Sequence, residues 1–150
     1  MPMMTDTLPI RRAGLADIPA CAAVANWWID DTEWLPRDHP ADVVEDMIRE
    51  ALPIREIWVA GDPIEAYLSF DPVGFRVGAL FCRHGGRGVG KALMDRVKQG
   101  QKYLWLTTHE PNLRAQKFYI REGFTEVERF MPEPPETVRE VKMEWRADEV

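Results

Sequence analysis

A glycine-rich stretch at residues 85–94, GGRGVGKALM, contains the residue types that hold phosphate groups in many proteins. It follows the apolar segment VGALFC at residues 77–82 and leads into residues with helical spacing, which predicts a strand, a turn and the start of a helix. Unpaired N–H groups and the helix dipole favour an anion at such a terminus, and glycines let oxygen atoms approach the backbone closely. The stretch therefore predicts a cradle for a phosphorylated ligand.

The same letters fit two kinds of phosphate cradle. From Gly85 they spell G-x-x-x-x-G-K, as in a nucleoside-triphosphate P-loop, but Ala92 stands where that loop needs a hydroxyl to hold Mg²⁺. The next expected strand, YLWLTT at residues 103–108, ends in threonines and supplies no Asp for the metal. An ATP-binding protein stays open as an alternative that lacks one defining residue. A turn that only joins a strand to a helix is another.

A second stretch, EPNLRAQKFYIREGF at residues 110–124, helps to interpret the glycine-rich stretch. Together they resemble the GCN5-related N-acetyltransferase (GNAT) superfamily, in which a turn of the form Q/R-x-x-G-x-G/A holds the pyrophosphate of acetyl-CoA. A later helix of that family carries N-x-x-A-x-x-x-Y-x-x-x-G-F. The residues that match this later pattern are Asn112, Ala115, Tyr119, Gly123 and Phe124. The layout also resembles, more loosely, the phosphinothricin acetyltransferase-like branch.

The resemblance implies acetyl-CoA as cosubstrate and no metal. The turn motif begins at Gly85, where Gln or Arg is usual, and Gly88 and Gly90 fill its two small positions. The strand before it should pair with the pantetheine arm, opposite residues 106–108 of its parallel neighbour. Backbone N–H groups from Arg87 to Ala92 form the expected cradle. The expected cofactor-binding residues are Leu80, Phe81, Cys82, Arg87, Gly88, Val89, Gly90, Lys91, Ala92, Asn112, Phe118 and Tyr119.

Acetyl transfer from a thioester to an amine needs a neutral amine and a proton for the leaving thiolate. Tyr119 falls at the family's tyrosine position and is the expected general acid, because a phenol with a pKa of about 10 can donate at neutral pH. The alternative is that Tyr119 is an aromatic residue with a packing role only. His109 ends the strand beside the expected thioester and is the favoured base, although it could be a polar loop residue. Glu65, Asp31 and Glu110 are further candidates.

Two other residue groups have both a functional and a structural interpretation. The segment NWWIDDT at residues 26–32 places aromatic rings beside carboxylates, which suits a cationic amine and predicts Trp28, Asp31 and Thr32 as acceptor contacts. Core tryptophans beside a solvated acidic loop are the alternative. Asn112 could contact the cofactor or cap a helix. Cys82 could be a nucleophile, but a cysteine in an apolar strand is usually a core residue.

Composition limits the function classes. The chain has 150 residues and a formal net charge of −6, which disfavours nucleic-acid binding because phosphate-tracking surfaces need excess Lys and Arg. No apolar run has the length of a membrane helix and no signal peptide is visible, so a cytoplasmic protein without a membrane partner is expected. The three histidines have no metal-ligand spacing. A homodimer is one expectation for assembly, with Trp34 or Phe130 at the interface.

The expected architecture is α/β (α+β), a GNAT fold over residues 1–150 as a single domain. A mixed sheet of about seven strands should carry helices on both faces, with strands 4 and 5 parallel and splayed. Asp17 is expected to cap the first helix. The expected strands are residues 10–12, 57–60, 64–70, 77–82, 103–108, 124–130 and 138–145, and the helices start near residues 17 and 40 and span 88–98 and 113–122.

The expected function is N-acetyl transfer from acetyl-CoA to a primary amine of a small molecule or peptide, directly within a ternary complex. A GNAT-fold module that binds CoA without turnover is the alternative, because VGALFC lacks the Glu that many relatives carry on this strand.

Overall fold

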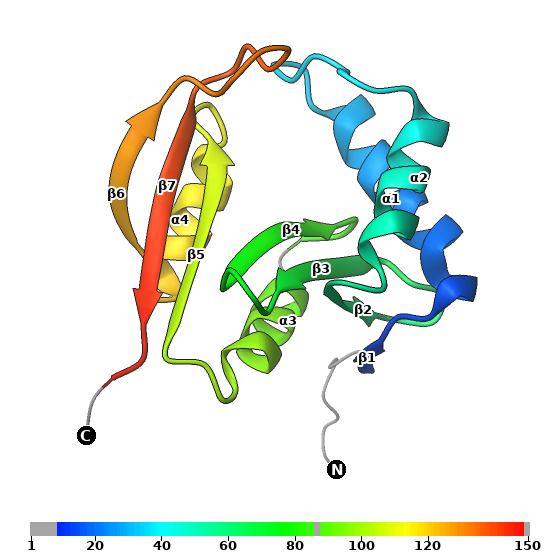
Figure 1. Cartoon of the computed structure of the whole chain (residues 1–150), viewed down its shortest axis with the longest axis horizontal. Coiled ribbons are helices and arrows are strands. Elements are labelled where there is room, and N and C mark those ends of the chain that lie inside the picture. Colours follow the sequence, from blue (N-terminus) through cyan, green and yellow to red (C-terminus); the bar gives the residue numbers. More distant parts are fainter. Residues whose placement is uncertain (1–8, 86–87, 149–150) are drawn as a thin grey trace.

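A computed structural model describes residues 9–85 and 88–148 (Figure 1). The elements in chain order are β1 (Ile10–Arg12), a 3₁₀ turn (Leu15–Asp17), α1 (Ile18–Asp31), α2 (Ala41–Ala51), β2 (Glu56–Ala60), β3 (Ala66–Asp71), β4 (Arg76–Cys82), α3 (Val89–Lys98), β5 (Tyr103–His109), α4 (Leu113–Arg121), β6 (Thr125–Phe130) and β7 (Glu140–Arg146). The strands form one seven-stranded sheet in the order β1-β2-β3-β4-β5-β7-β6. The expected element order and sheet are confirmed.

The parallel pair β4 and β5 opens into a fork. All other neighbouring strands are antiparallel, whereas β4 and β5 share one bridge pair, Arg76 with Trp105, among the described residues. Beyond this pair the two strands diverge, and Figure 1 shows them at a wide angle. The splay expected from the family is confirmed. It leaves the two edges that face each other, one on β4 and one on β5, without a described sheet partner beyond the bridge pair.

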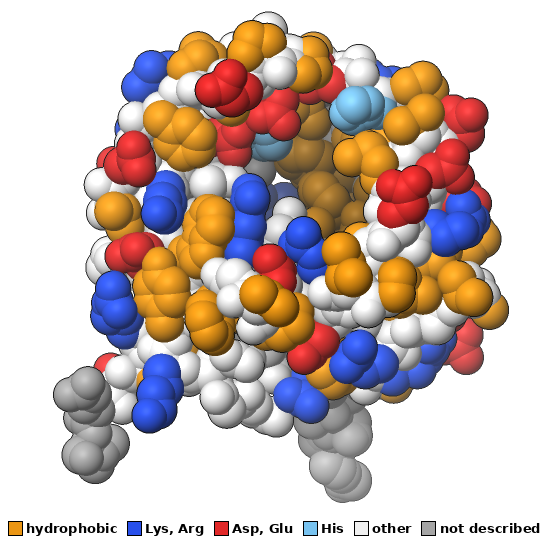
Figure 2. Space-filling model, viewed as in Figure 1, with side chains coloured by type: hydrophobic (Ala, Val, Ile, Leu, Met, Phe, Trp, Pro, Cys, Tyr) orange, Lys and Arg blue, Asp and Glu red, His pale blue; other side chains and the backbone are white. Residues whose placement is uncertain are grey.

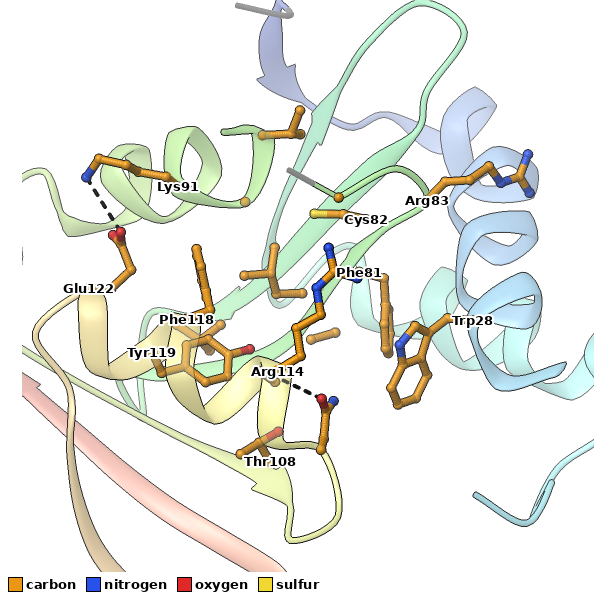
Figure 3. Close-up of a pocket in the computed structure, with 18 of the residues that line it drawn as sticks. Trp28, Phe81, Cys82, Arg83, Lys91, Thr108, Arg114, Phe118, Tyr119 and Glu122 are labelled. Atoms are coloured by element: carbon orange, nitrogen blue, oxygen red, sulfur yellow. Dashed lines mark hydrogen bonds and ion pairs between the residues drawn. The ribbon is translucent and has the colours of Figure 1, made fainter. Parts of the chain in front are cut away.

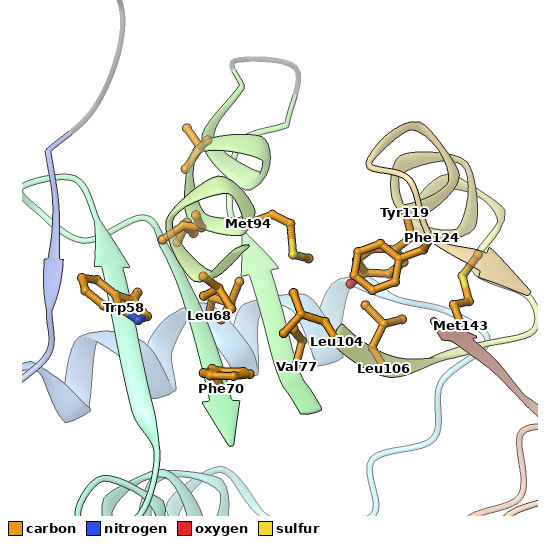
Figure 4. Packing of buried hydrophobic residues seen from close by; sticks show 14 of the residues in the cluster. Trp58, Leu68, Phe70, Val77, Met94, Leu104, Leu106, Tyr119, Phe124 and Met143 are labelled. Atoms are coloured by element: carbon orange, nitrogen blue, oxygen red, sulfur yellow. The ribbon is translucent and has the colours of Figure 1, made fainter. Parts of the chain in front are cut away.

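Helices cover both faces of the sheet, as expected. On one face α1 and α2 pack on alternate residues of β2 and β3, with Ile18, Ile48 and Tyr67 among the buried contacts. On the other face α3 and α4 pack on a larger cluster that includes Leu68, Met94, Leu104, Tyr119 and Phe124 (Figure 4). The period-two alternation of the strands separates these two cores, because successive side chains point to opposite faces.

Two glycines adopt the left-handed conformation at the helix termini that the motifs predict. Gly88 precedes α3 with φ of 74°, and Gly123 follows α4 with φ of 96°. Gly123 donates its N–H to the carbonyl of Ile120, and the next residue, Phe124, bonds back to Tyr119 and is buried. These bonds are the left-handed C-terminal cap expected from the sequence.

The start of α1 differs from the expectation. The Asp17 carboxylate makes no capping bond to α1. It accepts instead from the N–H of Gly14 at 2.8 Å and from the Arg11 guanidinium at 2.7 and 2.8 Å. The bidentate arginine on β1 competes for the carboxylate oxygens and turns them toward the preceding 3₁₀ turn. β7 likewise begins at Glu140, two residues after the expected start at Val138.

Candidate active site

The fork between β4 and β5 holds a cavity of about 810 Å³. Its lining extends from the N-terminus of α3, along both strands, to the C-terminal end of α1 (Figure 3). Figure 2 shows this face hollowed between the two halves of the molecule, with hydrophobic side chains on the wall and both acidic and basic side chains around the rim. The expected site residues that line the cavity are Trp28, Asp31, Thr32, Leu80, Phe81, Cys82, Gly88, Val89, Gly90, Lys91, His109, Asn112, Phe118 and Tyr119.

The N-terminus of α3 meets the requirements of an anion cradle. Gly88 is the N-cap residue, and a Cβ built on it would meet no heavy atom within 4 Å, so the space beside it is open. The N–H groups of the first helical turn follow at residues 89–91, where an α-helix supplies no acceptors. These features fit the phosphates of a CoA ester. The expected Arg87 lies outside the described residues.

One cradle residue was assigned wrongly. The N–H of Ala92 donates to the carbonyl of Gly88 at 3.0 Å, and its side chain does not line the cavity. This bond is the first regular hydrogen bond of α3, so the donor is already used. Lys91 lines the cavity, and its ammonium lies 3.5 Å from Glu122 and 3.4 Å from Asp95.

Cys82 and Phe118 pack around the second small position of the motif. A Cβ on Gly90 would lie 3.4 Å from the Phe118 ring and 3.6 Å from Cys82 Sγ, which leaves room for glycine or alanine only. Burial raises the pKa of the Cys82 thiol to about 11. The thiolate fraction at neutral pH is therefore very small, which argues against the nucleophile hypothesis.

Tyr119 lies between the cavity and the core. Its ring packs at 5.3 Å from Phe118 and 5.7 Å from Phe124, with only 8% of the residue exposed. Burial raises the pKa of its phenol above the ordinary value near 10. The hydroxyl is therefore protonated throughout the neutral range, as a proton donor must be, and the packing interpretation of the ring also holds.

Asn112 is a helix cap. Its side-chain oxygen accepts from the N–H of Ala115 at 3.0 Å, while the residue also lines the cavity. The buried Gln116 holds the preceding loop by donating to the carbonyls of His109 and Glu110 at 3.3 and 2.8 Å. These bonds fix the start of α4 relative to the end of β5, where the expected base lies.

Aromatic rings from two sides meet at the other end of the cavity. Trp28 of α1 packs on Phe81 of β4 at 5.0 Å and stacks on His109 of β5 at 6.2 Å. Trp34 completes the group at 6.1 Å from Trp28 and 5.4 Å from His109. The Thr32 hydroxyl donates its hydrogen to the Trp28 carbonyl at 2.6 Å. Its oxygen can therefore accept a hydrogen bond from a bound amine, but the hydroxyl has no hydrogen left to donate.

His109 is half-buried within these rings. Burial lowers its pKa below the ordinary 6.5, although Glu140 and Asp38 oppose the shift. Neither Glu65 nor Glu110 lines the cavity, and Glu110 is paired with Arg129 at 3.3 Å. Of the four candidate bases, His109 and Asp31 therefore remain beside the cavity.

Sequence reasoning missed two residues of this region. Arg114 lines the cavity from the first turn of α4, but the N-x-x-A pattern leaves its position unspecified. Trp34 was assigned to an interface because its segment is a polar loop, whereas it packs on two aromatic residues of the same chain. Glu136 hydrogen-bonds with Glu140, the residue of β7 that pairs with His109, and burial raises the pKa of Glu136.

Comparison with known proteins defines the class. A sequence model of the acetyltransferase (GNAT) family matches residues 22–124. The chain therefore belongs to the GNAT acetyltransferase family, and its activity class is acyl transfer. This membership replaces the P-loop alternative for the glycine stretch. A search of curated protein sequences found no match.

Solved structures share the fold over nearly the whole chain. A GCN5-related N-acetyltransferase from Rhodopseudomonas palustris superimposes with a TM-score of 0.79 at 16% identity, covering 98% of this chain and 100% of its own. YncA from Salmonella typhimurium, solved with acetyl-CoA, gives 0.71 at 18% identity and covers 97% and 96%. A protein described as a phosphinothricin N-acetyltransferase gives 0.73 at 18%, covering 95% and 100%. These identities support the fold alone.

The described residues also bear on metal binding and on membrane spanning. Within residues 9–85 and 88–148, no group of three or more His, Cys, Asp or Glu side chains could hold a metal ion. No helix in the same part of the chain is long and apolar enough to cross a membrane.

Proposed function

We propose that the protein transfers an acetyl group from acetyl-CoA directly to a primary amine of a small molecule or peptide, within a ternary complex. One observation carries this proposal: a single cavity joins an open anion cradle at Gly88 to an aromatic chamber at Trp28 and His109, through the fork of β4 and β5. Bound acetyl-CoA supplies the thioester. The fork lets a phosphorylated chain enter on the α3 side while the amine enters on the α1 side.

The cofactor end would be held mainly by backbone groups. The N–H groups at residues 88–91 face the phosphates, and the unpaired edge of β4 at residues 80–82 pairs with the amides of the pantetheine arm. Phe118 flanks that arm, and Asn112 orients the start of α4 beside it. The left-handed Gly88 keeps the approach to the cradle open.

At the acceptor end, aromatic faces and a carboxylate suit a cationic amine. Trp28 offers a ring face to an ammonium, and Asp31 adds a negative charge on the lining, while Trp34 packs against Trp28 outside the lining. An imidazole nitrogen of His109 takes the proton that the ammonium must lose before it can attack, because burial keeps this ring neutral. Tyr119 Oη gives a proton to the leaving sulfur, because its phenol lines the cavity and is protonated at neutral pH.

A thermal-shift titration with acetyl-CoA tests the cofactor half. A ligand at 100 times its Kd stabilises the fold by about 2.7 kcal/mol, which raises Tm by roughly 5–10 °C in a domain of this size. ATP with Mg²⁺ is the control and should give no shift. Release of free CoA thiol is then measured with a diamine, an amino acid and a peptide as acceptors. Absence of a shift with acetyl-CoA would contradict the proposal.

One observation favours a second candidate, a CoA-binding module without turnover. The strand β4 carries no carboxylate, and the histidine that β5 places on the cavity lining is His109. A thermal shift with acetyl-CoA, but no thiol release with any acceptor class, would support this candidate.

A further inference from the structure

The Arg114 guanidinium fills the space that a side chain at residue 85 would need. Gly85 stands at the position where the family turn usually carries Gln or Arg. Its φ lies outside the left-handed region, so the backbone itself does not require a glycine. A Cβ built on Gly85 would overlap the Arg114 guanidinium. The absence of a side chain at residue 85 therefore makes room for an arginine that comes from α4.

Arg114 reaches the cavity from the first turn of α4. Figure 3 shows its side chain extending from that helix toward Cys82 at the end of β4. A cation in the first turn of a helix opposes the helix dipole, so Arg114 is unfavourable for α4 taken alone. An anion bound beside it would compensate for this cost.

Two neighbouring cations on the lining, Lys91 and Arg83, are already engaged. Lys91 lies within ion-pair distance of Glu122 and Asp95. Arg83 turns away, since its guanidinium donates to the Ala23 carbonyl at 3.4 Å and covers the Trp27 ring at 5.8 Å. Arg114, by contrast, makes no ion pair with any residue in the described part of the chain.

We propose that Arg114 supplies from α4 a phosphate-binding side chain, in the space that Gly85 leaves open at the position where the family turn usually carries Gln or Arg. Its planar guanidinium can donate two parallel hydrogen bonds to phosphate oxygens, opposite the N–H groups of α3. The two helices then hold the pyrophosphate from both sides. This inference rests on the proposed function, because it assumes that a CoA ester occupies the cavity.

Calorimetric titration of Arg114→Gln with acetyl-CoA and with dephospho-CoA tests the inference. A charged hydrogen-bond pair of this kind is worth roughly 1.5–3 kcal/mol, so Kd should rise about 10- to 100-fold for both ligands. Lys117→Gln is the matched control: it removes a charge from the exposed side of the same helix and should leave Kd within about twofold. An equal Kd in Arg114→Gln and wild type would overturn the inference, and a loss restricted to acetyl-CoA would assign Arg114 to the 3′-phosphate instead.

A position swap gives a second, independent test. Arg114→Gly should weaken binding, and the double variant Gly85→Arg with Arg114→Gly should recover most of the lost affinity, because the cation returns to the loop. Gly85→Arg alone should bind worse than the double variant, since two guanidinium groups compete for one space. No recovery in the double variant would contradict the idea of a relocated cation. If wild-type protein binds neither acetyl-CoA nor dephospho-CoA, the proposed function fails together with this inference.

Discussion

Trp28 of α1 and His109 of β5 stack with ring centroids 6.2 Å apart and planes 27° from parallel. This contact joins two segments that are far apart in the sequence, at the proposed acceptor end of the cavity. It also removes water from the imidazole, and that burial is the main reason why the His109 pKa is lowered. The ring is therefore held in its neutral, proton-accepting form.

His109→Gln should lower kcat by about 10²-fold or more if the imidazole accepts the proton of the acceptor ammonium. His39→Gln is the matched control, because His39 is an exposed histidine outside the cavity lining, and its kcat should be unchanged. Both rates are measured by thiol release at saturating substrates. Equal rates for the two variants would exclude His109 as the base.

The same ring has a testable titration. Because the His109 pKa is lowered, the imidazole should stay neutral until the pH falls below 6.5, the ordinary value. An NMR titration of the three histidines, with His109→Gln to assign the signals, measures the midpoint. A midpoint above 6.5 would mean that Glu140 and Asp38 outweigh burial.

Tyr119→Phe should lower kcat by about 10²-fold with little change in the Kd of acetyl-CoA, because only the proton donor is removed. The ring contacts with Phe118 and Phe124 are kept, so the melting temperature should change little. Tyr67→Phe removes a buried hydroxyl from the opposite core, at a residue outside the cavity lining, and should leave kcat unchanged. If Tyr119→Phe turns over at the wild-type rate in single-turnover experiments, another group protonates the thiolate.

Asp17→Asn should lower the melting temperature by about 2–4 °C at pH 7. The Arg11 guanidinium and the Gly14 N–H lower the pKa of the Asp17 carboxyl to about 2, below its unfolded value near 3.9. The stabilisation is therefore present above pH 4 and lost as the pH falls from about 4 through about 2.

Thermal melts of Asp17→Asn and wild type at pH 7, 4 and 3 measure this dependence. Asp46→Asn, which removes one partner of an exposed pair with Arg49, should have little effect at any of these pH values. A difference between Asp17→Asn and wild type that is equally large at pH 3 and pH 7 would contradict the linkage.

The fold was predictable because its local signals agree with one another. The left-handed glycines at residues 88 and 123, the Asn112 cap and the alternation of Val141 and Met143 in β7 all act within a few residues. Asp17 was misassigned because its decisive partner, Arg11, lies on β1, outside the helix that its position appeared to cap in the sequence.

Only the part of the candidate site that backbone groups form was predictable from the sequence. The proposed cradle follows from glycine spacing, whereas the proposed acceptor chamber depends on which rings meet across the fork. Trp34 and Arg114 reach the cavity region through tertiary contacts with His109 and Gly85, and such contacts leave no periodic signal in the sequence. Ala92 is the opposite case, a motif residue that was predicted to bind phosphate. Its N–H is already hydrogen-bonded within α3, which the motif does not reveal.

Gly88→Glu should abolish acetyl-CoA binding while the protein stays folded. The substitution adds a Cβ at φ of 74°, which costs about 1–2 kcal/mol, but the space around it is open. The new carboxylate would project from the N-cap of α3 into the position proposed for the phosphates, where like charges repel.

Gly100→Glu is a matched control for this change. Gly100 also has a left-handed φ, of 80°, with open space around it, but it follows α3 at the helix end opposite the cradle. Both variants should therefore lose similar thermal stability, and only Gly88→Glu should lose the thermal shift with acetyl-CoA. If both variants retain the wild-type shift, the phosphates bind elsewhere. If both lose it, the effect of Gly88→Glu comes from backbone strain or net charge, and the N-terminus of α3 has no special role.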